Sequence, residues 1–286
     1  MTTYDTVSFL SDYGSVDEFV GVVHSVIRQL APDAVVIDVA HQIPPHDIRA
    51  GGLALARAAQ YLAPGAVLAV VDPGVGTSRR AVALEVGDGA AVYVGPDNGL
   101  LAPAVAMVGG ATRAFELIEP RYQLAAPGPT FAGRDVFGPA AAHLCAGVPI
   151  AELGPEIDTA SLTPGMMPIT RQEGDLLFAE VLWTDHYGNL QLNVDPAEIA
   201  QHGDRIELRF DNRVRTGVRH RSYANVPTGE VGLVVDSYGL VTVAVDRGSA
   251  ADELGIGTGD EVVLVPIPDD GRPIGVVAPV TLREKP

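Results

Sequence analysis

The sequence predicts an α/β domain followed by a small antiparallel β-barrel or β-sandwich domain, and two patterns support this fold class. The first half alternates short apolar runs with amphipathic stretches, which is the β-α-β order of a largely parallel sheet with helices on both faces. The second half carries short alternating segments separated by Asn, Gly and Asp. We therefore expect a first domain over 1–160, a linker rich in Pro and Gly over 161–172, a second domain over 173–267 and a mobile tail over 268–286.

Each expected element of the first half has its own local signal. Strands are short runs rich in β-branched residues, and helices carry apolar residues at helical spacing with an acidic residue near the start. The run GDG between two strands indicates a hairpin rather than a phosphate loop, because no helix follows it. In chain order we expect a strand over 6–10, a helix from Asp17 to Pro32, a strand over 34–39, a helix over 47–61, strands over 67–71, 81–86 and 91–94, and two later loops that enter helices.

The second half is expected to form short strands. Its apolar segments are short, alternate with polar residues and are bounded by turn-forming residues. They cover 176–183, 189–194, 205–210, 213–217, 231–235, 240–245 and 261–265.

Composition excludes several classes of function. The 286 residues carry a formal net charge of −17, which argues against a nucleic-acid partner. No apolar run approaches the length of a membrane span, and the N-terminus lacks the pattern of a signal peptide, so we expect a soluble, cytoplasmic protein. The single cysteine, Cys145, rules out a disulfide framework. The seven histidines show no paired ligand spacing, and we expect no metal site.

The stretch VLAVVDPGVGTSRR, residues 67–80, is the strongest candidate for a functional site. It reads as a buried strand that ends at Asp72, followed by a tight Pro-Gly turn after which Arg79 could fold back on the carboxylate. A charged pair beyond the carboxyl end of a strand is where open α/β sheets build their sites. A strand-ending turn with a solvated Asp72 is the competing interpretation.

Further polar residues follow other predicted strands. Singly they are weak signals, because Asp12 could cap the following helix, Asn98 suits a turn, and His143 suits a helix residue satisfied inside the fold. Several such loops converging at the carboxyl edge of one sheet form a stronger signal than any one of them. The other positions are His46 with Asp47, the loop 130–134, and the motifs TDHYGN and DSYG in the second half.

The motifs DPGVGTSRR, PDNGLL, TFAGRDVFGPAAAHL, DHYGN and DSYG, in that order, resemble the S-adenosyl-L-methionine (SAM) hydroxide adenosyltransferase family. These are the adenosine-forming SAM hydrolases, and the SAM-dependent fluorinase and chlorinase belong to the same superfamily. The resemblance implies an α/β domain, a β-barrel domain and a homotrimer whose sites lie between one subunit's first domain and its neighbour's second. It also implies substitution at C5′ of the ribose of SAM, which releases methionine and leaves adenosine, with SAM as substrate and no cofactor.

Site residues follow from the resemblance position by position. Asp12 resembles the carboxylate that holds the ribose hydroxyls, a role that suits a group able to accept both diol protons. Asp185 and Ser237 fall where the family binds the amino and carboxylate groups of methionine. The resemblance implies that Asn189 and the backbone of Arg247 contact the adenine side of SAM. The other implied substrate-binding positions are His46, Val75, Phe131 and Gly133.

In the hydrolytic branch, Asp72 and Arg79 resemble two members of an Asp, Arg and His set that positions the attacking water. The third member is missing, because Ala132 stands where that branch has histidine. We expect Asp72 and Arg79 to act mainly by orientation, with the arginine lowering the pKa of the carboxyl group, and we expect weakened hydrolysis.

Two other functions remain open. Alanine at the histidine position also fits a SAM- or adenosine-binding protein with little turnover, either an inactive natural form or an engineered variant. The halogenating branch also lacks the histidine, so a 5′-halo-5′-deoxyadenosine synthase is the second alternative. A carboxylate beside the entering halide opposes it by about 4 kcal/mol at about 4 Å for an effective dielectric constant near 20. Asp72 therefore favours water, although Arg79 would offset part of that repulsion.

Overall fold

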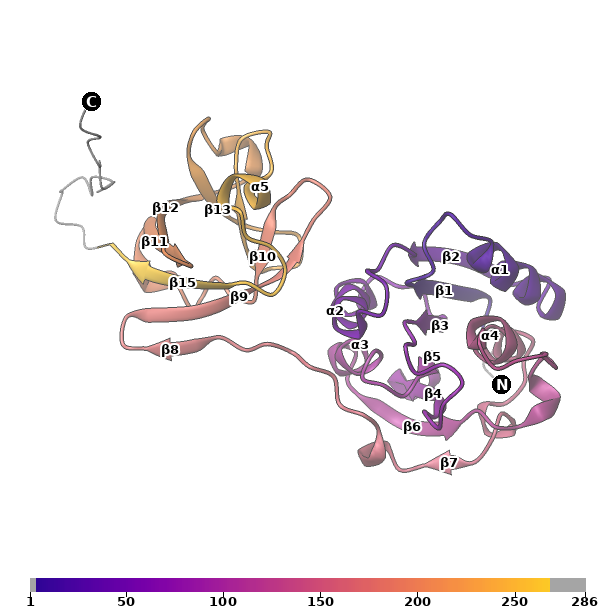
Figure 1. The fold of residues 1–286 in the computed structure, drawn as a ribbon. Helices are drawn as coiled ribbons and strands as arrows, with labels where there is room; N and C mark the ends of the chain where they lie inside the picture. The colour runs from indigo at the N-terminus through magenta and orange to yellow at the C-terminus, as the bar shows by residue number, and fades with distance from the viewer. Residues whose placement is uncertain (1–3, 268–286) are drawn as a thin grey trace, which may run out of the picture. The chain divides into compact units, whose positions relative to one another are not determined.

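The computed structural model describes residues 4–267, and the chain within it divides into two units at Met167 and Pro168 (Figure 1). Each unit has its own hydrophobic core. The predicted mobile tail, 268–286, lies outside the described residues. Within the described part of the chain, no helix is both long and apolar enough to cross a membrane.

A seven-stranded sheet forms the centre of the first unit, in the order β2-β1-β3-β5-β4-β6-β7. The first four strands of that order are parallel, whereas β4 runs antiparallel to both of its neighbours and β7 pairs antiparallel with β6. The predicted hairpin at GDG is confirmed as the β4–β5 connection. The strands are β1 (Thr6–Ser11), β2 (Val35–Ala40), β3 (Gly65–Val70), β4 (Ala81–Val86), β5 (Ala91–Pro96), β6 (Ala111–Glu116) and β7 (Glu156–Ile157).

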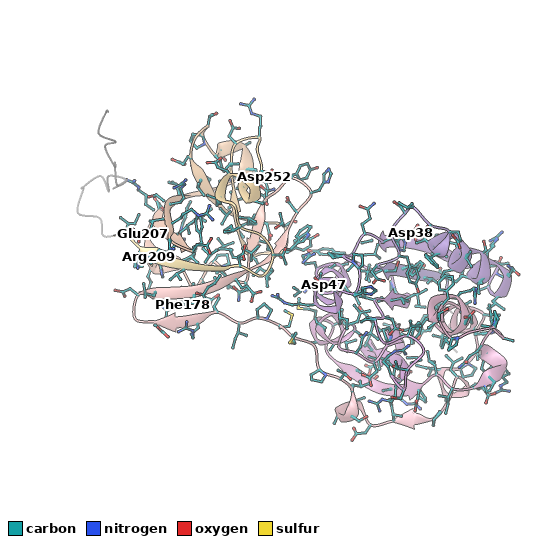
Figure 2. The ribbon with its side chains drawn as sticks, viewed as in Figure 1. Asp38, Asp47, Phe178, Glu207, Arg209 and Asp252 are labelled. Atoms are coloured by element: carbon teal, nitrogen blue, oxygen red, sulfur yellow. The ribbon has the colours of Figure 1, made fainter. Side chains whose placement is uncertain are left out.

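Helices cover both faces of this sheet, as the β-α-β order predicts (Figure 1). On one face pack α1 (Phe19–Leu30) and α4 (Gly138–Cys145), and on the other α2 (Ile48–Ala59) and α3 (Ala102–Met107). Helix α2 starts where predicted because the Asp47 side chain accepts a hydrogen bond from Ala50 N at 2.8 Å (Figure 2). Helix α1 begins two residues after Asp17, since Glu18 occupies the N-cap position.

The second unit is a closed barrel, which decides between the predicted barrel and sandwich. Strand β10 pairs with both β9 and β14, and this double pairing closes the sheet. One pair departs from the predicted antiparallel pattern: β12 and β13 are parallel, because residues 221–230 carry the chain back across the barrel before β13 begins. The elements are β8 (Arg171–Glu173), β9 (Leu176–Thr184), β10 (Leu190–Leu192), β11 (Arg205–Phe210), β12 (Arg213–His220), β13 (Val231–Val235), β14 (Val241–Ala244), α5 (Ala250–Leu254) and β15 (Glu261–Pro266).

The residues at the two ends of the predicted linker belong to different units. Thr163 N donates to the Asp97 carboxylate at 2.7 Å, which ties the start of the linker to the first unit. Arg171–Glu173 forms strand β8 of the barrel. On the barrel surface, Glu207 and Arg209 lie two residues apart on β11 and form an ion pair (Figure 2).

Candidate active site

A cavity of about 220 Å³ opens at the carboxyl ends of β1 and β3. Asp12 follows β1, and Asp72 comes two residues after the end of β3. Because parallel strands bring these ends to one edge of the sheet, residues from loops far apart in sequence meet there. The lining comprises Asp12, Tyr13, Phe19, Pro45, His46, Val70, Asp72, Val75, Thr130 and Ala132.

Asp72 and Arg79 form the predicted charged pair, and the solvated interpretation of Asp72 is wrong. The guanidinium of Arg79 donates through Nε to Oδ1 at 3.0 Å and through Nη2 to Oδ2 at 2.6 Å, which is the bidentate geometry. The Arg79 side chain is 13% exposed and the Asp72 side chain is 5% exposed. Arg79 also donates to Arg80 O at 2.8 Å, and its guanidinium lies over the Phe137 ring. The pair therefore holds one fixed orientation.

The pKa of Asp72 differs from the expectation that arginine lowers it. Burial raises the pKa of the carboxyl group, while Arg79 and the Gly74 backbone N–H oppose that rise and Asp12 adds to it. The net direction is upward, because desolvation of the carboxylate is the largest effect. Asp72 is consequently a better proton acceptor than an arginine-paired surface aspartate would be.

Asp12 does not cap helix α1. Its Oδ2 instead accepts a hydrogen bond from His46 N at 2.9 Å, which joins the loop after β1 to the loop before α2. His46 adopts a φ of 68°, an uncommon conformation for a residue other than glycine. Within residues 4–267 the other carboxylate oxygen, Oδ1, has no hydrogen bond, so it can accept one from a ligand, which fits a group that holds a diol.

Tyr13 is a site residue that the sequence reasoning missed. Its ring packs edge-on against Phe131, with centroids 5.5 Å apart, and also contacts Phe19. Burial raises the pKa of its hydroxyl, and the nearby charges of Asp12 and Asp72 raise it further. The phenol is therefore a neutral hydrogen-bonding group in this cavity. Only its place directly after Asp12 hinted at it.

Phe131 and Gly133 do not line the cavity; they support the residue that does. A Cβ at Gly133 would lie 2.2 Å from the Tyr13 hydroxyl oxygen, so glycine is required there by the position of Tyr13. Phe131 packs against both Tyr13 and Phe19.

Replacing Gly133 by Ala is expected to destabilise the fold by about 1–3 kcal/mol, because the added methyl group must displace the buried Tyr13 ring. Gly128→Ala is the matched control, since a Cβ there meets nothing within 4 Å. Urea denaturation of both variants measures the difference. Equal stability of the two variants would contradict the contact between Gly133 and Tyr13.

Ala132 lies directly before a π-helix, Gly133–Phe137, and lines the same cavity as Asp72. Its methyl side chain offers no donor or acceptor, so Asp72 is the member of the predicted set that lines this cavity and can accept a proton from a water. The neighbouring Arg134 is paired with buried Asp135 at 2.6 Å.

Three further candidates have structural roles. Asn98 donates to Val71 O at 2.9 Å and accepts from Leu100 N, which confirms its turn role and fixes the chain just before Asp72. His143 stacks edge-on against Tyr122 inside the fold, and burial lowers its pKa. Burial raises the pKa of the Cys145 thiol to about 11, so it is an unreactive packing residue.

The barrel carries a second cavity, of about 1010 Å³. All four of the predicted second-domain residues line it, namely Asp185, Asn189, Ser237 and Arg247. Trp183, Tyr187, Tyr223 and Tyr238 give it aromatic walls. A cavity with aromatic walls and a few polar groups is typical of a site for a small organic ligand.

Two aspartates shape this cavity by folding their own loops. Asp185 accepts hydrogen bonds from Tyr187 N, Asn189 N and Asn189 Nδ2 at 2.8–2.9 Å. Asp236 accepts from Tyr238 N at 2.8 Å and from Gln191 Nε2 at 2.6 Å. The DHYGN and DSYG motifs are therefore two similar Asx turns that present Ser237 and Asn189 to the cavity.

Gln191 is a second residue that the sequence reasoning missed. Gln191 is among the residues that line the cavity, although it is only 2% exposed. Its buried Oε1 has no hydrogen-bond partner among residues 4–267. A buried acceptor left without a donor is costly unless a ligand supplies one. Arg247, in contrast, forms an ion pair with the adjacent Asp246 and is largely exposed, with φ 48°.

The first unit has a cavity lined by carboxylates at the carboxyl ends of its parallel strands, and the barrel has a cavity with aromatic walls. This arrangement is typical of a two-domain enzyme that acts on a small molecule. The sequence matches the SAM hydroxide adenosyltransferase N-terminal domain over residues 7–154 and the C-terminal domain of the same family over residues 179–263. The chain belongs to the SAM hydroxide adenosyltransferase family.

Individual relatives agree with this membership. The chain is 45% identical to an (R)-S-adenosyl-L-methionine hydrolase of Salinispora tropica, over 90% of this chain and 96% of that one. It is 26% identical to a fluorinase of Actinoplanes over 83% and 90% of the two chains. An uncharacterised conserved protein of Thermotoga maritima has the same fold, with a TM-score of 0.84 and 30% identity over 91% of this chain and 99% of that one.

Proposed function

We propose that this protein hydrolyses SAM to adenosine and methionine by attack of water at C5′ of the ribose. The observation that carries the proposal is the convergence of Asp12, Asp72 and Ala132 on one cavity in a chain that is 45% identical to a SAM hydrolase. The first residue offers a free carboxylate oxygen to the ribose, and the second stands where a nucleophilic water would be held.

The reaction makes modest chemical demands on the protein. The water oxygen forms a bond to C5′ while the C5′–S bond breaks. The electron pair of the breaking bond moves to sulfur, so methionine leaves as a neutral thioether. The attacking water loses one proton, which Asp72 accepts and passes to solvent. Because the leaving group needs no general acid, positioning of the water in line with C5′ is the main contribution of the site.

The barrel cavity is proposed to hold the methionine and adenine parts of SAM. Ser237 and the Asp185 loop are assigned to the amino acid, and Asn189 to the base. Following the family resemblance, we further propose a homotrimer in which one subunit's first unit and its neighbour's barrel complete each site. Light scattering at working concentration tests the assembly, and a monomeric mass would contradict it. Cytoplasmic location remains a prediction from the sequence.

Asp12→Asn is expected to raise KM for SAM by roughly 10-fold or more with a smaller effect on kcat. The charged acceptor that pairs with the ribose diol is lost, and hydrogen bonds to charged groups contribute about 1.5–3 kcal/mol. Steady-state kinetics with SAM check the prediction. Asp47→Asn serves as control, because that carboxylate caps α2 outside the cavity. A Michaelis constant unchanged by Asp12→Asn would argue against ribose binding there.

A SAM-binding protein with little turnover is the second candidate function, and Ala132 is the observation that favours it. Calorimetric titration with SAM, followed by mass spectrometry of the same sample, separates the two. Adenosine and methionine formed in equal amounts support hydrolysis. Saturable binding, with SAM recovered intact after long incubation, would show that the protein binds SAM without hydrolysing it.

A further inference from the structure

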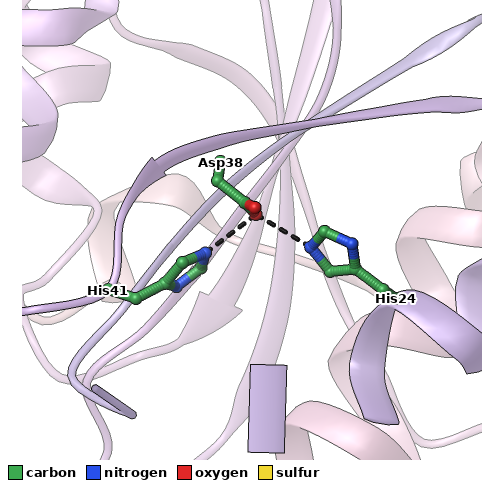
Figure 3. A group of neighbouring side chains, drawn as sticks. All are labelled: His24, Asp38 and His41. Atoms are coloured by element: carbon green, nitrogen blue, oxygen red, sulfur yellow. Dashed lines mark hydrogen bonds and ion pairs between the residues drawn. The ribbon is translucent and has the colours of Figure 1, made fainter. Parts of the chain in front are cut away.

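A cluster of three metal-ligating side chains lies in the first unit, outside the proposed active site (Figure 3). It consists of His24 from α1, Asp38 from β2 and His41 from the loop after β2. Both histidines point an Nε2 atom at the same carboxylate oxygen, Oδ1 of Asp38, and each distance is 2.8 Å. This group is not visible in the sequence, because the helix that carries His24 must first fold onto the sheet edge.

The local backbone explains why the three side chains converge. Strand β2 is the edge of the sheet and pairs only with β1. Asp38 is in register with Phe9, but the next partner pair is Leu10 with Ala40, so Val39 is skipped as a bulge. Bulges at sheet edges re-aim side chains. This one follows Asp38 directly and precedes His41, which then turns back toward the same carboxylate.

We propose that His24, Asp38 and His41 bind a divalent transition-metal ion of the zinc type. Two imidazole nitrogens and one carboxylate oxygen are a donor set that Zn²⁺ accepts, with the remaining position left to water. The three ligand atoms already lie within 4.8 Å of one another. Ligands about 2.1 Å from a tetrahedral zinc ion stand about 3.4 Å apart, so side-chain rotation alone can close the site.

Exposure and charge at the cluster fit an ion that enters from solvent. His24 and Asp38 side chains are 35% and 47% exposed, whereas His41 is 11% exposed and anchors the site. Asp38 supplies a carboxylate oxygen and the negative charge of the donor set.

A hydrogen-bond partner behind His41 supports the assignment. Its Nδ1 lies 2.8 Å from the hydroxyl of fully buried Ser11, a group that can accept the Nδ1 proton and so free Nε2 for the metal. Ser11 directly precedes Asp12, and Gly14 N donates to His41 O at 2.6 Å. The metal site therefore adjoins the loop assigned to the ribose without including any of its side-chain ligands.

Equilibrium dialysis of tag-free protein against Zn²⁺ tests the proposal. About one bound zinc per chain is expected. His24→Ala is expected to weaken binding on the order of 100-fold, since loss of even an outer partner of a metal ligand costs about 10–100-fold. His220→Ala is the matched control, because it removes a histidine of the barrel that pairs with Glu230 and should leave zinc binding unchanged.

Asp38→Asn distinguishes metal binding from folding, since the amide oxygen still accepts both histidine hydrogen bonds but lacks the charge. A folded Asp38→Asn protein, judged by circular dichroism, that loses zinc supports the site. Co²⁺ substitution should give visible absorption bands in the wild type and not in this variant. Absence of zinc binding in the wild type, or zinc binding by His24→Ala and Asp38→Asn equal to that of the wild type, would overturn the proposal.

Discussion

Asp72→Asn is expected to lower kcat for SAM hydrolysis by about 10²–10⁴-fold. The amide keeps the shape of the carboxylate but can neither accept the proton of the attacking water nor neutralise Arg79, which donates to both carboxylate oxygens. Loss should appear in kcat more than in KM, because the interaction strengthens as the water gives up its proton. Steady-state assay of adenosine release measures the effect.

Asp97→Asn is the matched control for Asp72→Asn. Asp97 also forms a buried pair with an arginine, Arg80, at 2.8 Å, but it does not line the cavity. Both substitutions remove one partner of a buried pair and should destabilise the fold by about 3–5 kcal/mol. Only Asp72→Asn should abolish turnover in protein that is still folded. Comparable activity losses in the two variants would show that Asp72 acts through stability alone.

Ala132→His is expected to raise kcat by about 10²–10⁴-fold with little change in KM. Position 132 faces the cavity that Asp72 lines, so an imidazole there can accept a proton from the same water. Ala132→Gln is the control, because its amide orients a water but cannot take its proton. The same gain in both variants would show that a side chain at position 132 acts only by orienting the water. An unchanged rate in Ala132→His would contradict the assignment of this position to the catalytic set.

The fold was predictable because its signals are local. Alternation of apolar runs and amphipathic stretches gave the parallel sheet, and short alternating strands gave the barrel. The parallel β12–β13 pair escaped prediction, since strand direction depends on a connection that carries no pattern of its own. For the same reason the bulge at Val39 is invisible in the sequence: it depends on register between two strands.

The site was predictable where one motif held both partners, as in Asp72 and Arg79, which lie seven residues apart. It was not predictable where partners meet only through the fold. Tyr13 owes its position to Gly133, and the direction of the Asp72 pKa shift depends on burial by segments outside its own turn. His24 and Asp38 likewise meet only when α1 packs on the sheet edge.

Incubation of the purified protein with SAM in oxygen-18 water that contains chloride, followed by mass spectrometry of the nucleoside, tests SAM hydrolysis most directly. Hydrolysis at C5′ predicts adenosine with one labelled oxygen and an equal amount of methionine. A 5′-chloro-5′-deoxyadenosine product, or SAM recovered intact, would contradict it.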